Sequence, residues 1–397
     1  MKTPMITRLL PLFVMCPFLH ALSPAIPLEP VVNANTALAV DLYHQFRTGD
    51  GNLFFSPYSI SSAMAMAWAG ARGNTAEEMQ KALNFSDENE TVNLGFQLLN
   101  DRMQSMARES QQQLNIANGL CLVGGDLSAD FKALLKEAYD AEIFGGDLEV
   151  INRWVAEKTR GKIETILDEL DPNTVAVILN AIYFKGEWAH AFDADRTRSQ
   201  PFSISPEQTR DVELMYRKGT YKYLAHDDYQ AVTLPYRGDR FTLDVILPTE
   251  RHGLAALEEK MDAETLAEWL QDLDKARSRE IELFLPRMKM ETDYNLVKPF
   301  QVLGIQDAFK EGIADFQGMG WPVGELWIGD IVHKAFLEVN EEGTEAAAAT
   351  AVVMVTRAAP MEPPVFRADH PFLFIIRENS TGSILFMGRM SGPATSE

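Results

Sequence analysis

Residues Thr174–Trp188 read TVAVILNAIYFKGEW, an almost continuous run of apolar residues, many of them β-branched or aromatic. A strand buried on both faces shows such a run, whereas a strand with one face in water alternates apolar and polar residues. The stretch therefore predicts a central strand of a buried sheet. Asn180, in its middle, needs hydrogen-bond partners if it is buried.

The sequence before this run differs in pattern from the sequence after it. Apolar residues recur at helical spacing before it, and short strand-like runs follow it. The expected helices are residues 33–47, 58–71, 129–138 and 151–163, with another short helix opened by a capping box at Thr75 and Glu78. The other expected strands are residues 52–57, 241–248, 280–290, 325–339, 371–378 and 383–390.

This order of elements predicts the fold class. Helices first and strands later, without regular alternation, favour an α+β fold with a large mixed sheet. The late strands have no helices of their own, so the early helices must cover them. We therefore expect a single domain over residues 26–397.

Composition limits the classes of partner. The chain has 397 residues, 46% of them apolar, and a formal charge of −21. A nucleic-acid or anionic-membrane partner needs clustered Lys and Arg, which this charge argues against. No segment after the N-terminal one is apolar enough to span a membrane. We therefore expect no nucleic-acid partner and no membrane span.

The N-terminus, MKTPMITRLLPLFVMCPFLHALSPA, has the layout of a secretory signal peptide. A basic start precedes an apolar run from Leu9 to Leu22, and small residues follow. We expect residues 1–25 to be removed and the mature protein to be secreted, either extracellular or periplasmic. Cys16 raises the alternative of a lipoprotein anchor, which Met15 before it does not favour.

A search for catalytic motifs finds none. The zinc-protease, nucleophile-elbow, Walker and dinucleotide-binding motifs are absent, and no Cys/His cluster has zinc spacing. His333, in the strand-like run IGDIVHKAF, is interpreted as a buried histidine bonded to polar neighbours. Cys121, the only cysteine after the N-terminal segment, is interpreted as a buried thiol. We therefore expect no catalytic, metal or cofactor site. A secreted hydrolase is the alternative, and only scattered Ser and His residues support it.

Residues 341–364, EEGTEAAAATAVVMVTRAAPMEPP, are unusual so near the end of a core-rich chain. Small residues come first, β-branched residues follow, and Arg357 is the only basic residue between Lys334 and Arg367. An Ala-rich helix over residues 341–350 is one interpretation, although the β-branched residues after it weaken a helix.

Four segments together resemble the serpin family. They are NLFFSPYSISSAMAMAWAGARGNTAEEM (52–79), LNAIYFKGEWAHAF (179–192), DIVHKAFLEVNEEGTEAAAAT (330–350) and FRADHPFLFIIRENSTGSILFMGRM (366–390). They follow one another in the family's order, within residues 33–391. The resemblance implies three β-sheets, about nine helices and an exposed reactive-centre loop, here at about residues 341–364. It also implies a monomeric protease inhibitor, not an enzyme, that needs no cofactor.

The resemblance further implies a suicide mechanism. A protease attacks the loop as a substrate and forms an acyl-enzyme. The cleaved loop then inserts into the central sheet and traps the protease in a covalent 1:1 complex. Inhibitory members keep small residues in the hinge of the loop, as this sequence does. The alternative is a non-inhibitory serpin that acts as a carrier or chaperone.

The hinge is where insertion would begin. By the resemblance it comprises Glu341, Gly343, Thr344, Glu345, Ala346, Ala347, Ala348, Ala349 and Thr350. Side chains alternate along a strand. If Thr344 points inward after insertion, every second residue after it in the inserting part also points inward, and none of these residues is charged. Glu345 then faces solvent. The prolines of the segment all follow the part that would insert.

Counting along the family pattern from Glu341 places the cleaved bond at Arg357–Ala358. Arg at this position fits a primary pocket floored by a carboxylate, as in trypsin-like serine proteases. An Arg-specific cysteine protease is the alternative target. Cleavage near Val353 or Val355, or at Met354, would shorten the inserting arm. A register difference of one residue would move the position to Thr356 or Ala358.

Two groups of supporting residues also follow from the resemblance. The shutter, which would latch the central strands, comprises Ser56, Ser59, Asn180 and His333. The breach, where insertion would start, comprises Trp188, Arg287 and Glu341. Arg287 and Glu341 are expected to form an exposed ion pair of about 0–1 kcal/mol that gates insertion.

A heparin-type cofactor would need a basic helix face. Residues 89–108 contain only Arg102 and Arg108 as basic residues. We therefore expect no activation by heparin.

Overall fold

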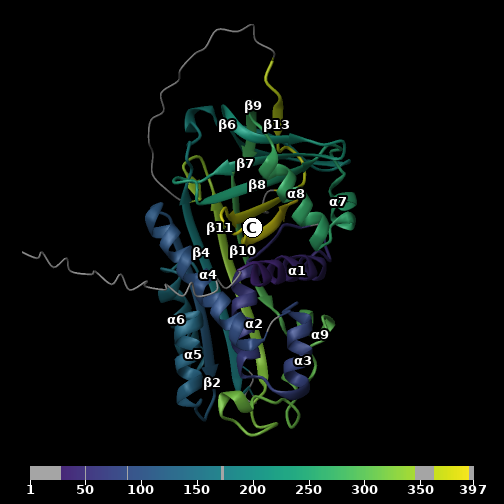
Figure 1. The fold of residues 1–397 in the computed structure, drawn as a ribbon. Helices are drawn as coiled ribbons and strands as arrows, with labels where there is room; N and C mark the ends of the chain where they lie inside the picture. The colour runs from purple at the N-terminus through teal and green to yellow at the C-terminus, as the bar shows by residue number, and fades with distance from the viewer. Residues whose placement is uncertain (1–27, 50, 87, 171–173, 345–361, 393–397) are drawn as a thin grey trace, which may run out of the picture.

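A computed structural model of the chain describes residues 28–392, except residues 50, 87, 171–173 and 345–361. Its nine α-helices within these residues are α1 Glu29–Phe46, α2 Pro57–Gly70, α3 Gly73–Ala82, α4 Asn89–Glu109, α5 Ala129–Tyr139, α6 Leu148–Lys158, α7 Leu254–Lys260, α8 Ala263–Lys275 and α9 Val297–Val302. The helices lie around two sheets (Figure 1), and the predicted α+β fold class is confirmed.

The described residues contain fifteen strands, several of which were not expected from the sequence. They are β1 Leu53–Phe55, β2 Gln113–Leu122, β3 Glu142–Gly145, β4 Ala176–Glu187, β5 Arg198–Ser205, β6 Gln208–Ala225, β7 Tyr229–Pro235, β8 Phe241–Pro248, β9 Ser278–Pro286, β10 Met288–Asn295, β11 Ile328–Val339, β12 Gly343–Thr344, β13 Val365–Arg367, β14 Phe372–Glu378 and β15 Ile384–Met390. The run at 174–188 became β4, a central strand that is buried on both faces, as its composition predicts. Helices α7, α8 and α9 lie among the late strands, so the expectation that those strands have no helices of their own was wrong.

The central sheet has the order β10-β11-β4-β2-β3, and the short β12 pairs with β4. β4 and β11 are neighbours and run parallel, with Asn180 opposite His333. On its other side β4 pairs antiparallel with β2, where Asn118 lies opposite Asn180. A row of polar side chains therefore crosses three strands in the middle of an apolar sheet.

The other strands form one nine-stranded sheet, which contains the second and third sheets that the resemblance implied. The 18-residue β6 joins two parts of it. One part of β6 pairs with β9, and its last residues, from Lys222 on, pair with β7. In Figure 1 the part with β6, β9 and β13 forms the upper end of the molecule. The third sheet thus continues the second through one long strand.

Two local predictions were wrong. Residues 280–290 do not form one strand: the chain leaves β9 at Pro286 and enters β10 at Met288, so the two halves belong to different sheets. Thr75 does not cap α3, which begins at Gly73. The Thr75 hydroxyl instead accepts the amide hydrogen of Asp315 at 3.1 Å.

Side chains alternate between two cores along β4. Ala176, Ile178, Ile182 and Phe184 face the main core, which α2 fills, with every residue of that helix buried. Val177, Leu179, Ala181 and Tyr183 face a smaller cluster made with α6 and the segment that follows it. β4 is therefore held from both faces, and any strand added beside it would meet both cores.

Residues 1–25, including Cys16, lie outside the described residues. Among the described residues, no helix is long and apolar enough to cross a membrane. Cys121 is a buried free thiol, as expected.

A buried ion pair provides a test of what stabilises the nine-stranded sheet. Arg377 on β14 donates to the fully buried Asp244 at 2.5 Å and to Asp274 at 2.7 and 2.8 Å. Arg377→Ala would leave a buried carboxylate unpaired, so we expect a loss of about 3 kcal/mol in the free energy of unfolding. Urea unfolding measures it.

The matched control for this experiment is Arg153→Ala. Arg153 pairs with Glu149 on the surface, with side chains 57% and 82% exposed. Its loss should change the free energy of unfolding by less than about 0.5 kcal/mol. Equal losses of unfolding free energy in the two variants would show that Arg377 stabilises the sheet no more than a surface ion pair does.

Candidate functional site

The candidate site is the seam between β4 and β11. Residues Ile328–Phe336 pair directly with Ala176–Tyr183 in a parallel ladder. Parallel strands bond through slanted and slightly weaker ladders than antiparallel strands. A new strand antiparallel to both could replace this ladder with two stronger ones.

Such a strand already begins at the upper end of the seam. After β11 the chain turns, with Asn340 N–H donating to the Gly343 carbonyl at 2.8 Å. Gly343 then pairs antiparallel with Glu187 of β4, and Thr344 pairs with Gly186. Gly343 has a φ of +149°, and a Cβ there would lie 2.0 Å from the Gly186 carbonyl oxygen. Only glycine therefore allows this approach.

Trp188 braces this turn from the end of β4. Its indole N–H donates to the Asn340 carbonyl at 2.9 Å, and its backbone N–H donates to the Glu342 carbonyl at the same distance. Its ring stacks on Tyr236, with centroids 4.6 Å apart. Trp188 thus ties the start of the predicted hinge to both sheets.

Arg287 and Glu341 form the predicted pair. Arg287 Nε lies 2.9 and 3.0 Å from the two carboxylate oxygens of Glu341, and its Nη2 lies 2.7 Å from one of them. The Thr197 hydroxyl also donates to this carboxylate. The pair was expected to be exposed, but the Glu341 side chain is only 8% exposed against 46% for Arg287. The turn folds over Glu341, which sequence alone does not reveal.

The environment of Glu341 keeps it ionised. Burial raises its pKa, but the hydrogen bonds from Arg287 and Thr197 outweigh that effect, and the pKa lies below its ordinary value. A charged carboxylate therefore holds the turn against the residues that directly precede β10 and β5 at neutral pH.

The four predicted shutter residues lie together in the middle of the seam. Ser56 N–H donates to Nε2 of His333 at 3.1 Å, so Nδ1 carries the ring proton and donates to Asn180 Oδ1 at 2.6 Å. Burial lowers the pKa of His333 to about 3, so the imidazole is neutral at physiological pH. A neutral ring thereby bridges β11, β4 and the start of α2.

Asn180 extends this network to α2. Its amide N–H₂ group lies 2.6 Å from the Ser59 hydroxyl and 3.0 Å from the Ser59 carbonyl. Ser56 caps α2 by accepting the Ser59 amide hydrogen at 3.2 Å, and its own hydroxyl donates to the Leu385 carbonyl. The helix start therefore holds both strands and the nine-stranded sheet.

Asn118 belongs to the same network but was missed from the sequence. Its Oδ1 accepts from Asn180 at 2.9 Å, and its amide donates to the Ser62 hydroxyl at 3.1 Å. The available signal was an Asn inside the apolar run NIANGLCLV, the same pattern that marked Asn180. The network consequently crosses β2 as well as β4 and β11.

A second missed feature covers the outer face of the seam. Ile163 and Ile166, which follow α6, pack in the smaller core with Val332 of β11. Lys334 on β11 donates to the Thr165 carbonyl at 2.5 Å. Separation of β4 and β11 must therefore displace this segment.

The other predicted site residues, Glu345–Thr350, Arg357 and Ala358, lie outside the described residues. Among the residues that are described, no group of three or more His, Cys, Asp or Glu side chains could hold a metal ion.

Known proteins resemble this chain in sequence over most of its length. The sequence profile described as "Serpin (serine protease inhibitor)" matches residues 33–393. Serpin B6 of Pongo abelii is 38% identical over 385 residues, covering 92% of this chain and all of that protein. Leukocyte elastase inhibitor of Equus caballus is 39% identical over 389 residues with the same coverage.

Solved structures share this fold. Human thyroxine-binding globulin complexed with its ligand has a TM-score of 0.83 at 30% identity, covering 92% of this chain and 99% of that chain. The thermophilic serpin Tengpin in its native state has a TM-score of 0.82 at 27% identity, covering 91% and 94%.

The shutter geometry predicts an effect of His333→Ala. Removing the ring leaves the Ser56 amide and Asn180 without their partner, so β4 and β11 should separate more easily. We expect faster polymer formation on heating at neutral pH, or conversion to a latent monomer, measured by native gel and size-exclusion chromatography. His190→Ala is the control, because His190 is exposed and lies three residues beyond the end of β4. Identical rates for the two variants would contradict a latch at His333.

Proposed function

The chain belongs to the serpin family, and on this basis we propose that it is an irreversible inhibitor of trypsin-like serine proteases. The family is one of protease inhibitors, so the protein is not an enzyme. Beyond family membership, the proposal states the inhibitory mechanism, the protease specificity and the residues responsible for both. The single observation that carries it is the antiparallel pairing of Gly343 and Thr344 with the upper end of β4.

Continuing this register predicts where an inserted arm would lie. Ala346 would come opposite Phe184, Thr350 opposite Asn180, and Met354 opposite Ala176. β4 extends over 12 residues, so an arm from Gly343 to Met354 would match it from end to end. Cleavage at Arg357–Ala358 lies just beyond this length, which supports that position over Met354.

The same register explains the composition of the arm. Residues opposite Phe184 and Ile182 would face the main core, and these are Ala346 and Ala348. Small side chains enter a packed interior with little strain. Thr350 would arrive between Asn180 and His333, where its hydroxyl could bond the polar groups that separation of the strands exposes.

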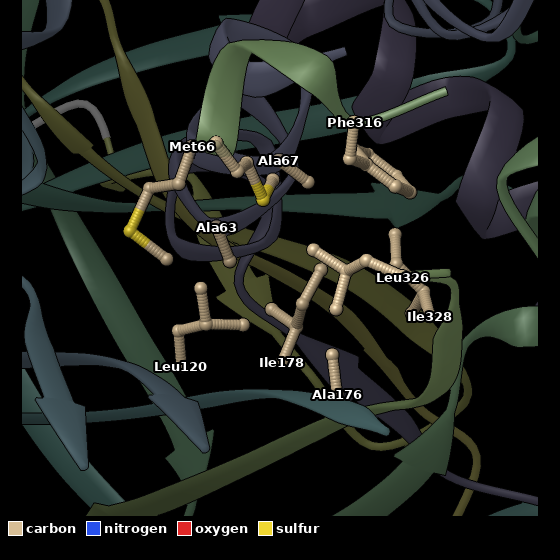
Figure 2. A pocket seen from close by; sticks show the side chains of 10 residues that line it. Ala63, Met66, Ala67, Leu120, Ala176, Ile178, Phe316, Leu326 and Ile328 are labelled. Atoms are coloured by element: carbon tan, nitrogen blue, oxygen red, sulfur yellow. The ribbon is translucent and has the colours of Figure 1, made fainter. Parts of the chain in front are cut away.

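A weak point in the packing lies under the lower end of the seam. Figure 2 shows Ala176, Ile178 and Ile328 facing Ala63 and Met66 of α2 around a cavity of about 10 Å³. Because the cavity is small and its walls are apolar, it holds no water. The side chains that line it therefore lack packing contacts on the side that faces the cavity. In the extended register, Val352 and Met354 would face this region and could fill it as the strands part.

Arg357 sets the proposed specificity. An Arg side chain pairs with a carboxylate at the base of a protease pocket through a bidentate contact. The name of the leukocyte elastase inhibitor states a different target for that relative, so similarity alone does not indicate the target here. An Arg-specific cysteine protease would use the same residue.

A carrier function is the second candidate. The structure of thyroxine-binding globulin, complexed with thyroxine, resembles this fold. A carrier would be cleaved at Arg357 without trapping the protease. The small hinge residues favour inhibition, since a carrier has no need to insert its loop.

The first experiment mixes the protein with trypsin and analyses the products on a denaturing gel and by mass spectrometry. We expect a band at the summed mass that survives SDS, and a C-terminal fragment that begins at Ala358. Thr344→Arg should convert the inhibitor into a substrate, because it would bury a charge in the main core.

Glu345→Arg is the matched control for Thr344→Arg, because it places the same charge on the opposite, outward face of the arm. It should still trap trypsin. Clean cleavage of the wild type without a complex would refute inhibition of trypsin. Trapping by Thr344→Arg would refute insertion in this register.

We also propose export, since the N-terminal pattern is that of a signal peptide and the family match begins only at residue 33. The mature domain would then extend from residue 26. N-terminal sequencing of protein recovered from a secreting host should find a start near Ile26. A start at Met1 would contradict removal of the segment.

A further inference from the structure

The upper part of the nine-stranded sheet has one face that the core does not fill. Side chains alternate between the two faces along each strand. On β6, Lys218 is exposed and Tyr216 is half-buried, whereas Met215 lies in the main core. On β9, Phe284 is half-buried and Leu283 lies in the same core. Tyr216 and Phe284 therefore belong to the outer face of the sheet.

Four side chains form a row across this outer face. Tyr216 of β6 lies opposite Phe284 of β9 in the strand register, and their ring centroids are 4.7 Å apart. The guanidinium of Arg196, on the 3-10 helix Ala194–Arg196, lies 4.0 Å from the ring centroid of Tyr216. At the other end, the guanidinium of Arg367 on β13 lies 4.5 Å from the ring centroid of Phe284. The row is an aromatic pair with one arginine at each end.

The two arginines of the row differ in their hydrogen bonds. Arg367 donates to Asp369 through Nε at 3.1 Å, and its guanidinium also donates to the Gln200 side chain. Arg196 is exposed, and no hydrogen bond or ion pair engages its guanidinium within the part of the chain that the structure describes. A guanidinium carries five N–H donors in a rigid fork. The cation–π contact therefore holds Arg196 in place without using any of these donors.

The row lies between the two ends of the loop segment. Directly after Arg196, the Thr197 hydroxyl donates to Glu341, which holds the turn before β12. At the other end of the row, Arg367 belongs to β13, the first strand after residues 345–361. Figure 1 places β6, β9 and β13 together at the upper end of the molecule. A protease that binds the loop would therefore lie next to this outer face.

The chemistry of Arg196 suits a carboxylate. The planar fork of a guanidinium matches the two oxygens of an Asp or Glu side chain, and a guanidinium stacked on a ring keeps the edge of its fork open. Because the ring already restricts the side chain, less conformational entropy is lost when a contact forms. Lys218 on the same face is already paired with Glu280 at 2.9 Å. Arg196 therefore offers this face an uncompensated and pre-positioned positive charge.

We propose that Arg196, held on Tyr216, binds an acidic side chain of the target protease beside its active-site cleft and so selects among Arg-specific proteases. This inference rests on the proposed function and deepens it. Arg357 suits the primary pocket of every trypsin-like protease, whereas Arg196 favours those that carry a carboxylate where they face β6. A charged contact at the rim of an interface acts mainly on the association rate and makes that rate depend on salt.

The experiment measures the second-order rate of trypsin inhibition at several NaCl concentrations. We expect Arg196→Glu to slow inhibition about tenfold at low salt, and the difference should shrink as salt rises. Arg196→Ala should slow inhibition less. Arg196→Lys, which keeps the charge but not the fork, should lie between Arg196→Ala and the wild type. The stoichiometry of inhibition should not change, because Arg196 touches neither the seam nor the strands beside it.

Arg198→Glu is the matched control for Arg196→Glu. Arg198 is also exposed and lies two residues away on β5, but its guanidinium donates to the Thr197 carbonyl at 2.7 Å. Both variants change the net charge equally, so any long-range attraction of the protease should fall by a similar amount in both. A larger loss of rate in Arg196→Glu therefore reports the local contact.

Modified trypsin tests the chemistry of the partner. Its surface carboxylates can be amidated while benzamidine protects the primary pocket. The wild type and Arg196→Ala should then inhibit this trypsin equally fast, because the proposed contact has lost its acceptor. A rate difference as large as that with unmodified trypsin would contradict a carboxylate partner.

Binding of catalytically inactive trypsin provides a readout that does not depend on trapping. Surface plasmon resonance should show slower association for Arg196→Glu than for Arg198→Glu. If the wild type traps no protease but binds inactive trypsin in this Arg196-dependent way, the proposed function fails and this inference stands. Equal association rates in the two variants would overturn the inference, and a wild type that neither traps nor binds trypsin would overturn both.

Discussion

The hydrogen bond between His333 and Asn180 closes the seam on which the rest of the molecule depends. It joins two parallel strands that would gain hydrogen bonds if an antiparallel strand came between them. The bond is made by neutral groups, because burial keeps the imidazole uncharged. The same network reaches α2 through Ser56 and Ser59. Opening the seam would disturb a helix and both sheets together, and in the proposed mechanism this supplies the kinetic barrier that keeps the closed state.

The chain on each side of residues 345–361 is also held by contacts of its own. At one end Gly343 lets the chain enter the pairing pattern of β4, and the Arg287–Glu341 pair holds the turn. At the other end β13 and Arg367 hold the chain to the opposite sheet.

The packing along the seam between β4 and β11 differs from its upper end to its lower end. The upper seam is held by a charged pair and the middle by a neutral polar network, while the lower end borders a small apolar cavity. A void withholds contacts from its lining, so the native packing there is weaker than an occupied core would be. In the proposed mechanism, insertion would replace that weak packing with the β-branched and Met side chains of the arm.

Sequence by itself determined the elements whose signal is local. The apolar run at 174–188 specified a doubly buried strand, and the family resemblance pointed to Asn180, His333, Arg287 and Glu341. Tertiary structure alone decided how they meet. It showed that residues 280–290 divide between two sheets, that Glu341 is buried, and that Asn118 completes the network. These properties arise from contacts between residues far apart in the chain, and periodicity and composition carry no record of which distant strands become neighbours.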